Sequence, residues 1–182
     1  IESLRTNRAT SWLVQRSEDR RNADRKTVLL RSNRVCSSNQ PYWIVKVGIA
    51  LGSNLGDRGE YILRAIERLR ELHEGVDADF LEASLLETEP VDCESGTPNF
   101  LNTVVELESS FAPFAILDFC QQIERDSGRP DVREKNSPRT VDVDMLYVGG
   151  IELNTDRLIL PHPRMHEREF VMAPLREIGV AE

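Results

Sequence analysis

The sequence lacks the features that define several protein classes. Its three cysteines, Cys36, Cys93 and Cys120, do not have the spacing of metal ligands, and their odd number argues against a disulfide framework. No apolar run approaches the length of a membrane span, which needs about 20 residues. These absences argue against a disulfide scaffold and a membrane partner, and they favour a protein of the reducing cytoplasm.

Basic residues are scarce beyond the first quarter of the chain. The 182 residues have a formal net charge of −8. Residues 1–45 contain nine Lys or Arg against four Asp or Glu (+5), whereas residues 46–182 contain 14 against 27 (−13). Nucleic-acid-binding cores normally present a basic face to the phosphate backbone. The acidic body therefore argues against a nucleic-acid partner.

Residues 1–44 also lack a sustained apolar period. They are rich in Arg, Ser and Asn, and we predict a disordered N-terminal extension there. Organelle transit peptides have a similar composition, but the acidic residues Glu18, Asp19 and Asp24 oppose that interpretation. Residues 45–182 carry the apolar periodicity and are long enough for one compact domain.

The most informative segment of the sequence is PRTVDVDMLY, residues 138–147. Alternation predicts a strand with Val141, Val143, Met145 and Tyr147 on one face and the two aspartates, Asp142 and Asp144, on the other. Aspartate is disfavoured in strands, and carboxylates on Cα atoms about 7 Å apart repel each other. Magnesium would reverse that repulsion, because it combines one or two protein carboxylates with water and phosphate oxygens. A solvated strand face is the alternative.

Basic residues flank this acidic pair on both sides. They are Arg125, Arg129, Arg133, Lys135, Arg139, Arg157, Arg164 and Arg168. Guanidinium groups recognise phosphate through forked hydrogen bonds, so two acids among many bases fit a metal-bound polyphosphate better than simple ion pairs. The polar segment 129–137 could close over a bound nucleotide, or it could be an ordinary solvated charge run.

Apolar periodicity predicts the remaining elements. Strands are expected over residues 45–51, 80–88 and 100–108, and a short returning strand over 151–153 after the Gly149-Gly150 turn. Three helices are expected: one that begins after Asp57, one over residues 113–128 and one around residues 170–178. The spacing of Asp57 and Glu60 is that of an N-terminal cap. The predicted buried stripe of the second helix is Ile116, Leu117, Cys120 and Ile123.

Three further features each have a functional and a structural interpretation. The glycine-rich turn 52–56 resembles a phosphate cradle but lacks the lysine of a P-loop, so it could be a tight turn only. Phe100 and Asn102 could stack on and hydrogen-bond a flat heterocycle, or they could cap a strand end. His162, between two prolines, could contact a phosphate or ribose, or it could be structural.

Four blocks together resemble the 6-hydroxymethyl-7,8-dihydropterin pyrophosphokinases of folate biosynthesis. They are GSNLG at 52–56, FLN at 100–102, PRTVDVD at 138–144 and LPHPRMHER at 160–168. The resemblance extends from about Val47 to Ile178. It implies a ferredoxin-like α+β fold with helices packed on a mostly antiparallel sheet. It also implies that pyrophosphate passes from ATP to the pterin's hydroxymethyl group and that AMP leaves.

The same resemblance implies site residues by position. Asp142 and Asp144 are implied to bind two Mg²⁺ ions, and Arg129 and Arg139 to steady the polyphosphate. The implied ATP positions are Gln121, Glu124, Lys135, Arg157, His162 and Arg168. The implied pterin positions are Thr88, Phe100, Asn102 and Phe170. Glu89, Asp131 and Asn136 depart from residues common in the family. The implied partners are therefore two small molecules, ATP and a reduced pterin. A monomer is expected.

Two other functions fit part of the sequence. A nucleotidyltransferase also combines a Gly-Ser turn with Asp-x-Asp, but normally within one strand-helix unit, whereas Gly52 and Asp142 are about 90 residues apart. A noncatalytic ferredoxin-like ligand-binding module would leave the acidic pair and the surrounding arginines without a shared purpose.

Overall fold

Strand β1 (Val45–Ser53) is the centre of the sheet in the computed structural model, which describes residues 43–90, 96–128 and 139–181. The five-stranded sheet has the order β2-β4-β1-β5, and β3 also pairs with β4. The other strands are β2 (Leu81–Glu82), β3 (Leu86–Thr88), β4 (Phe100–Ser109) and β5 (Asp142–Val148). All strand pairs in the described part of the chain are antiparallel.

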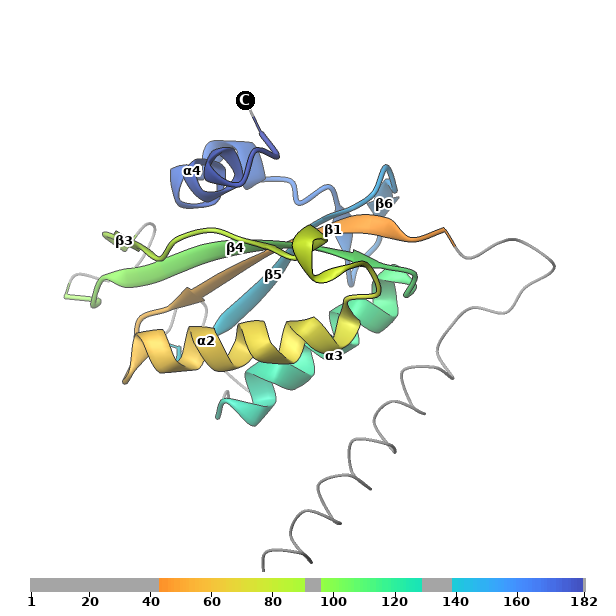
Figure 1. The fold of residues 1–182 in the computed structure, drawn as a ribbon. Coiled ribbons are helices and arrows are strands. Elements are labelled where there is room, and N and C mark those ends of the chain that lie inside the picture. The colour runs from red at the N-terminus through yellow and green to blue at the C-terminus, as the bar shows by residue number, and fades with distance from the viewer. Residues whose placement is uncertain (1–42, 91–95, 129–138, 182) are drawn as a thin grey trace, which may run out of the picture. The chain divides into compact units, whose positions relative to one another are not determined.

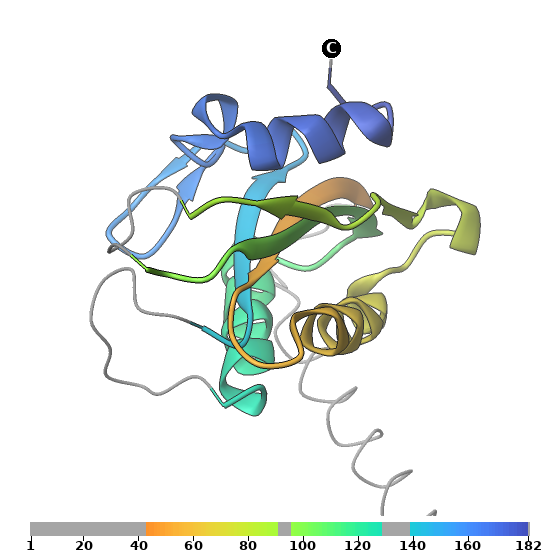
Figure 2. The ribbon, with the colours of Figure 1, turned by 90° about the vertical axis from the view of Figure 1, so that its left-hand side faces the viewer.

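Helices cover both faces of this sheet. Helices α2 (Arg58–Leu69) and α3 (Pro113–Asp126) lie on one face, and α4 (Glu169–Glu177) lies on the other (Figures 1 and 2). Short 3₁₀ turns occur at Arg70–Leu72, Asp77–Asp79 and Met165–Glu167. This arrangement confirms the predicted α+β fold and is compatible with the ferredoxin-like class. None of the described helices has the length and apolarity needed to cross a bilayer.

The core has a part on each face of the sheet. On β1, Val47, Ile49 and Leu51 are buried and alternate with Ala50, which packs toward α4. This alternation directs the three larger side chains to the face covered by α2 and α3. Beneath α4 a second cluster consists of Val104, Leu146, Met165, Val171 and Leu175. Each of these side chains stabilises the fold by about 1.5–3 kcal/mol through burial alone.

The helix boundaries follow the predicted signals. Asp57 caps α2, since its Oδ1 accepts a hydrogen bond from the Glu60 backbone N at 3.1 Å. Helix α3 begins at Pro113 and ends just before Gly128, whose φ of 90° is a left-handed conformation that glycine adopts without strain. The buried stripe of α3 differs at one predicted position. Phe119 is buried where Leu117 was expected, and Leu117 is only half-buried.

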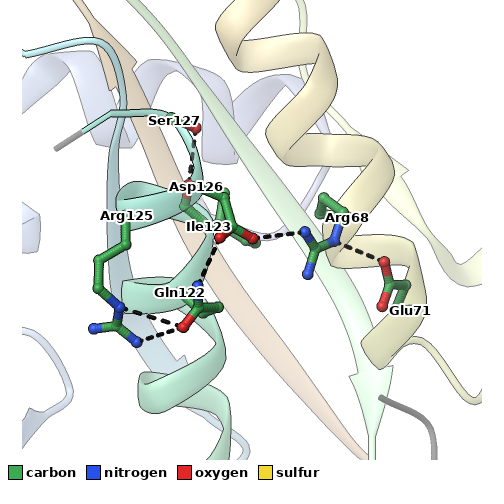
Figure 3. Close-up of polar contacts among 7 residues, drawn as sticks. All are labelled: Arg68, Glu71, Gln122, Ile123, Arg125, Asp126 and Ser127. Carbon is green, nitrogen blue, oxygen red and sulfur yellow. Dashed lines mark hydrogen bonds and ion pairs between the residues drawn. The ribbon is translucent and has the colours of Figure 1, made fainter. Parts of the chain in front are cut away.

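Polar contacts join α2 to α3 at one end of the pair (Figure 3). Arg68 of α2 pairs with Asp126 of α3 at 3.0 Å and with Glu71 at 2.7 Å. Asp126 also accepts from Gln122 Nε2 at 2.6 Å. Exposed ion pairs contribute at most about 1 kcal/mol each, so these contacts align the two helices more than they stabilise the fold.

The predicted continuous strand over residues 80–88 is wrong. Two short strands, β2 and β3, replace it, because Ser84 makes its bonds outside the sheet. Its backbone N and its Oγ both donate to Oε1 of Glu177 in α4, at 3.0 and 2.6 Å. The returning strand was also misplaced. Gly149-Gly150 does form a turn, but β6 (Leu153–Asn154) pairs with β7 (Ile159–Leu160) in a separate two-stranded sheet.

Tyr147 faces the opposite side of the sheet from its predicted one. The pairing of β1 with β5 shifts register between Gly48, opposite Tyr147, and Ile49, opposite Met145, so Leu146 is an additional residue. Tyr147 therefore turns toward the α4 side, and its hydroxyl donates to buried Glu106 at 2.5 Å. Lys46 Nζ bonds the same carboxylate at 2.8 Å. The tyrosine ring occupies the space that a side chain at position 48 would need.

A Gly48→Ala substitution tests this packing. The added Cβ would lie 2.3 Å from Cε1 of Tyr147, whose ring is held by the bond to Glu106. We expect the free energy of unfolding to fall by about 1–3 kcal/mol, the usual cost of overpacking, in urea titrations followed by circular dichroism. Gly150→Ala is the matched control, since no atom lies within 4 Å of its Cβ. Equal stability of the two variants would contradict the packing described.

Candidate functional site

The two aspartates share the α4 side of the sheet, at the end of β1 that leads into the glycine-rich turn. The register pairs Ala50 with Asp144 and Gly52 with Asp142 on one side of β1. On its other side, Gly52 is paired with Asn102. Side chains at paired positions lie on one face, so Asn102, Gly52 and Asp142 form a row across three strands. Both aspartates are half-buried, so a ligand above the sheet can reach them.

Asp142 is bound by an arginine that the glycine-rich turn holds in place. Arg139 Nη1 lies 2.6 Å from Asp142 Oδ2, and the side chains are only 17% and 21% exposed. Asn54 fixes the Arg139 backbone, because its Oδ1 accepts from the Arg139 N at 2.8 Å and its own N donates to the Arg139 O at 3.2 Å. The guanidinium carbon is also 5.9 Å from the Phe100 ring centre. The turn thus holds Arg139 beside Asp142.

Asp144 has a weaker basic neighbour and a buried thiol nearby. Arg168 Nη1 lies 3.7 Å from Asp144 Oδ2, and the same guanidinium is 5.6 Å from the Phe170 ring centre. On α3, burial, and after it the charge of Asp144, raises the pKa of the Cys120 thiol to about 12. Each aspartate therefore has an arginine beside it, and each arginine is also close to an aromatic ring.

Helix α3 contributes a buried carboxylate at the edge of β5. Glu124 Oε1 accepts a hydrogen bond from the backbone N of Val143, between the two aspartates, at 3.0 Å. Gln121, one turn earlier, is half-buried. Arg157 instead pairs with exposed Asp118 of α3 at 2.6 Å and lies 5.6 Å from the Phe114 ring centre. The structure thus brings Glu124 to the acidic strand and directs Arg157 to an exposed side of α3.

Three of the expected pterin residues form one cluster. Asn102 Nδ2 donates to Thr88 Oγ1 at 2.8 Å, and Thr88 is paired with Phe100 in the β3–β4 ladder. A Cβ at Gly52 would lie 2.8 Å from Asn102 Oδ1 and 3.7 Å from Phe100 Cδ1. Glycine at this position therefore leaves room for the buried side chain of Asn102. Phe170 comes from α4, where it is half-buried.

His162 is half-buried beside two arginines. Its backbone N donates to the Leu146 O at 2.7 Å, and its Nδ1 accepts from the Arg164 N at 3.2 Å. Burial first, then the charges of Arg168 and Arg164, lower the pKa of His162 below its usual value. The imidazole is therefore neutral at pH 7, and the bond at Nδ1 assigns the proton to Nε2. That nitrogen can donate one hydrogen bond to a ligand oxygen.

The donors present are suited to magnesium rather than to zinc. The described residues contain no group of three or more His, Cys, Asp or Glu that could hold a metal by itself. They do supply two carboxylates on one face, which is what Mg²⁺ uses when phosphate and water complete its shell. In the described part of the chain, four buried polar atoms nearby have no hydrogen-bond partner: Ser53 Oγ, Asn54 Nδ2, Arg139 Nε and Thr140 Oγ1.

Some predicted residues lie outside the described ones, and some contributors were missed. Arg129 and Lys135 fall outside the described part, as do Asp131 and Asn136. Sequence reasoning did not identify Asn54 as the residue that braces Arg139. Its place in the turn was a signal, but the partner is 85 residues away.

Comparison with known proteins identifies a matching family and several relatives. A family profile described as 7,8-dihydro-6-hydroxymethylpterin-pyrophosphokinase (HPPK) matches residues 48–180. The 2-amino-4-hydroxy-6-hydroxymethyldihydropteridine pyrophosphokinase of Bacillus subtilis (strain 168) is 46% identical over 131 residues, which are 71% of this chain and 75% of that protein. The protein of the same name from Haemophilus influenzae is 38% identical over 134 residues, 72% of this chain and 79% of its own length.

A plant relative matches over a smaller share of its own length. The mitochondrial folate synthesis bifunctional protein of Pisum sativum is 38% identical over 133 residues, which are 73% of this chain and 25% of that protein. The match therefore covers one part of a larger chain there. Because the family profile spans most of the described sheet and helices, the chain belongs to the 7,8-dihydro-6-hydroxymethylpterin-pyrophosphokinase family.

Proposed function

We propose that residues 45–182 form a pyrophosphokinase domain that transfers pyrophosphate from ATP to the hydroxymethyl group of 6-hydroxymethyl-7,8-dihydropterin and releases AMP. Family membership supports this reaction and its place in folate biosynthesis. The observation that carries the assignment to these residues is the pair Asp142 and Asp144 on one strand face, each beside an arginine. The protein acts in this proposal as a cytoplasmic monomer on two small-molecule substrates.

Asp142 and Asp144 are the proposed ligands of two Mg²⁺ ions. When bound, Mg²⁺ neutralises charge on the phosphate oxygens and helps to align the reacting groups. Arg139 and Arg168 pair with the two carboxylates in this structure. With the metal ions on the carboxylates, both guanidinium groups can turn to the phosphates, which they recognise through forked hydrogen bonds. Arg129 joins Arg139 in this role on the basis of the sequence.

The remaining ATP contacts are proposed on both sides of β5. Gln121 and Glu124 present polar groups from α3, while His162 and Arg168 lie on the segment that precedes α4. Neutral His162 offers its Nε2–H to an oxygen of the nucleotide, because its pKa is lowered. Arg157 and Lys135 complete the proposed set. Arg157 would exchange its exposed partner Asp118 for the ligand, which costs little for an exposed ion pair.

The pterin is proposed to bind between Phe100 and Phe170. Asn102 forms a hydrogen bond with the edge of the pterin. Because Nδ2 of Asn102 donates to Thr88, its Oδ1 is the atom that accepts from an N–H of the bicycle. The hydroxymethyl oxygen then attacks the β-phosphorus of ATP. The new O–P bond forms as the bond from that phosphorus to the α–β bridging oxygen breaks, AMP leaves with the bridging oxygen, and the hydroxyl proton is released. Alignment and charge neutralisation, more than a strong base, accelerate such a transfer.

The nucleotide product tests the reaction class. With ATP, Mg²⁺ and 6-hydroxymethyl-7,8-dihydropterin, we expect AMP and the pyrophosphorylated pterin in equal amounts by anion-exchange chromatography. A single-phosphoryl kinase would instead release ADP. A nucleotidyltransferase would release free pyrophosphate and leave AMP on the pterin. Either product would contradict the proposal, and binding of both ligands without turnover would favour the noncatalytic module.

Replacement of Asp144 tests the metal role. Asp144→Ala removes one of the two proposed ligands, so we expect kcat to fall by on the order of 10²–10³-fold or more, the usual effect of losing one element of transition-state charge stabilisation. Circular dichroism should show an unchanged fold, because Asp144 is half-buried above the core. Asp77→Ala, at an exposed position in a 3₁₀ turn, is the control and should keep wild-type turnover. Wild-type kcat in Asp144→Ala would refute the metal role.

A further inference from the structure

Arg58 joins the start of α2 to the cluster that carries Thr88 and Phe100. Its Nη1 donates to Glu87 Oε1 and to the backbone O of Asn99, both at 2.9 Å. Glu87 directly precedes Thr88, and Asn99 directly precedes Phe100. Thr88 and Phe100 form the end pair of the β3–β4 ladder, next to the pair of Glu87 with Leu101. One guanidinium nitrogen therefore holds both strands where the ladder ends.

The backbone of Arg58 is itself well fixed. Its N donates to the Gly56 O at 3.0 Å, and Gly56 has a φ of 68°, in the left-handed region. Asp57, immediately before Arg58, caps α2. The guanidinium thus extends from a capped helix end, which is a rigid base for a long side chain. The same turn holds Arg139 through Asn54, so residues 52–58 contact both the acidic pair and the cluster around Asn102.

The Arg58 contact affects the end of the β3–β4 ladder more than it affects the stability of the whole fold. Residues 89–99 connect β3 to β4, and a connection of that length does not fix the separation of the two strand ends by itself. The side chains of Arg58 and Glu87 are 31% and 54% exposed. Ion pairs this exposed contribute little to the free energy of unfolding, so the contact has little value as a general stabiliser. Its effect is local, on the positions of Thr88 and Phe100.

We propose that Arg58 is a positioning residue for the pterin, and this inference rests on the function proposed above. Arg58 does not touch the substrate in this scheme. It acts through Glu87 and Asn99, and it keeps Thr88 in place to bond Asn102 and Phe100 in place to stack on the ring. In the described part of the chain, the Arg58 side chain has no such contact with the proposed nucleotide residues, so its removal should affect the two substrates unequally.

The test compares KM values for the two substrates. For Arg58→Ala we expect the KM for the pterin to rise on the order of tenfold, as for loss of a hydrogen bond to a charged group, with the KM for ATP within about twofold of wild type. Arg58→Lys retains the positive charge but not the planar guanidinium group, so it should raise the KM for the pterin less than Arg58→Ala does. Glu87→Ala should add little in the Arg58→Ala background, because the two residues act through one contact.

The matched control is Arg64→Ala. Arg64 is on the same helix and has an exposed ion pair with Glu60 at 2.8 Å, but it has no described contact with the pterin cluster. Both KM values should stay at wild type. An unchanged pterin KM in Arg58→Ala, an equal rise in the KM for ATP, or a melting temperature well below that of Arg64→Ala would overturn the inference.

Equilibrium binding separates this inference from the proposed function. Fluorescence titration with 6-hydroxymethyl-7,8-dihydropterin needs no turnover, so it reports on the pocket even if the wild-type protein releases no AMP. Weaker binding by Arg58→Ala, with Arg64→Ala unchanged, supports the positioning role. Equal affinity in the two variants overturns it. Should Arg58→Ala fail to fold, Arg58→Lys and Glu87→Ala give the same comparison.

Discussion

Two like charges on one strand face repel each other, and the site depends on the cations that offset this repulsion. Arg139 and Arg168 provide that compensation in this structure, one beside Asp142 and the other beside Asp144. They come from different elements, one just before β5 and the other just before α4. The antiparallel register of β1 with β5 brings both aspartates to the α4 face, so strand pairing and charge compensation define one surface together.

Small residues on β1 determine how closely other groups approach that surface. Gly48 leaves room for the Tyr147 ring, and Gly52 leaves room beside Asn102 and Phe100. On the opposite face of the same strand, Val47, Ile49 and Leu51 are large and buried. The central strand therefore carries core side chains on one face and leaves space on the other. The candidate site extends across this space at the end of β1 that leads into the glycine-rich turn.

Most of the fold could be predicted from local periodicity and caps, because the signals for β1, β4, α2 and α3 lie within each segment. Two of the errors came from contacts distant in sequence. Ser84 bonds Glu177, 93 residues away, and this breaks the predicted strand. Tyr147 changes face because of a register shift against Gly48 that alternation alone does not reveal. In the site, spacing predicted that Asp142 and Asp144 share a face, but it could not identify Asn54 or Arg58 as braces, since their partners are remote in the chain.

The buried thiol of Cys120 makes local opening of α3 measurable. The thiolate is the form that reacts with alkylating reagents, and with a pKa of about 12 Cys120 stays a thiol at neutral pH while the helix is packed. The side chain is also fully buried, so a reagent reaches it only when the packing around α3 opens locally. The rate at which Cys120 is alkylated under native conditions thus measures how often the structure opens around the helix that carries Gln121 and Glu124. A ligand that bridges α3 to β5 will lower this alkylation rate.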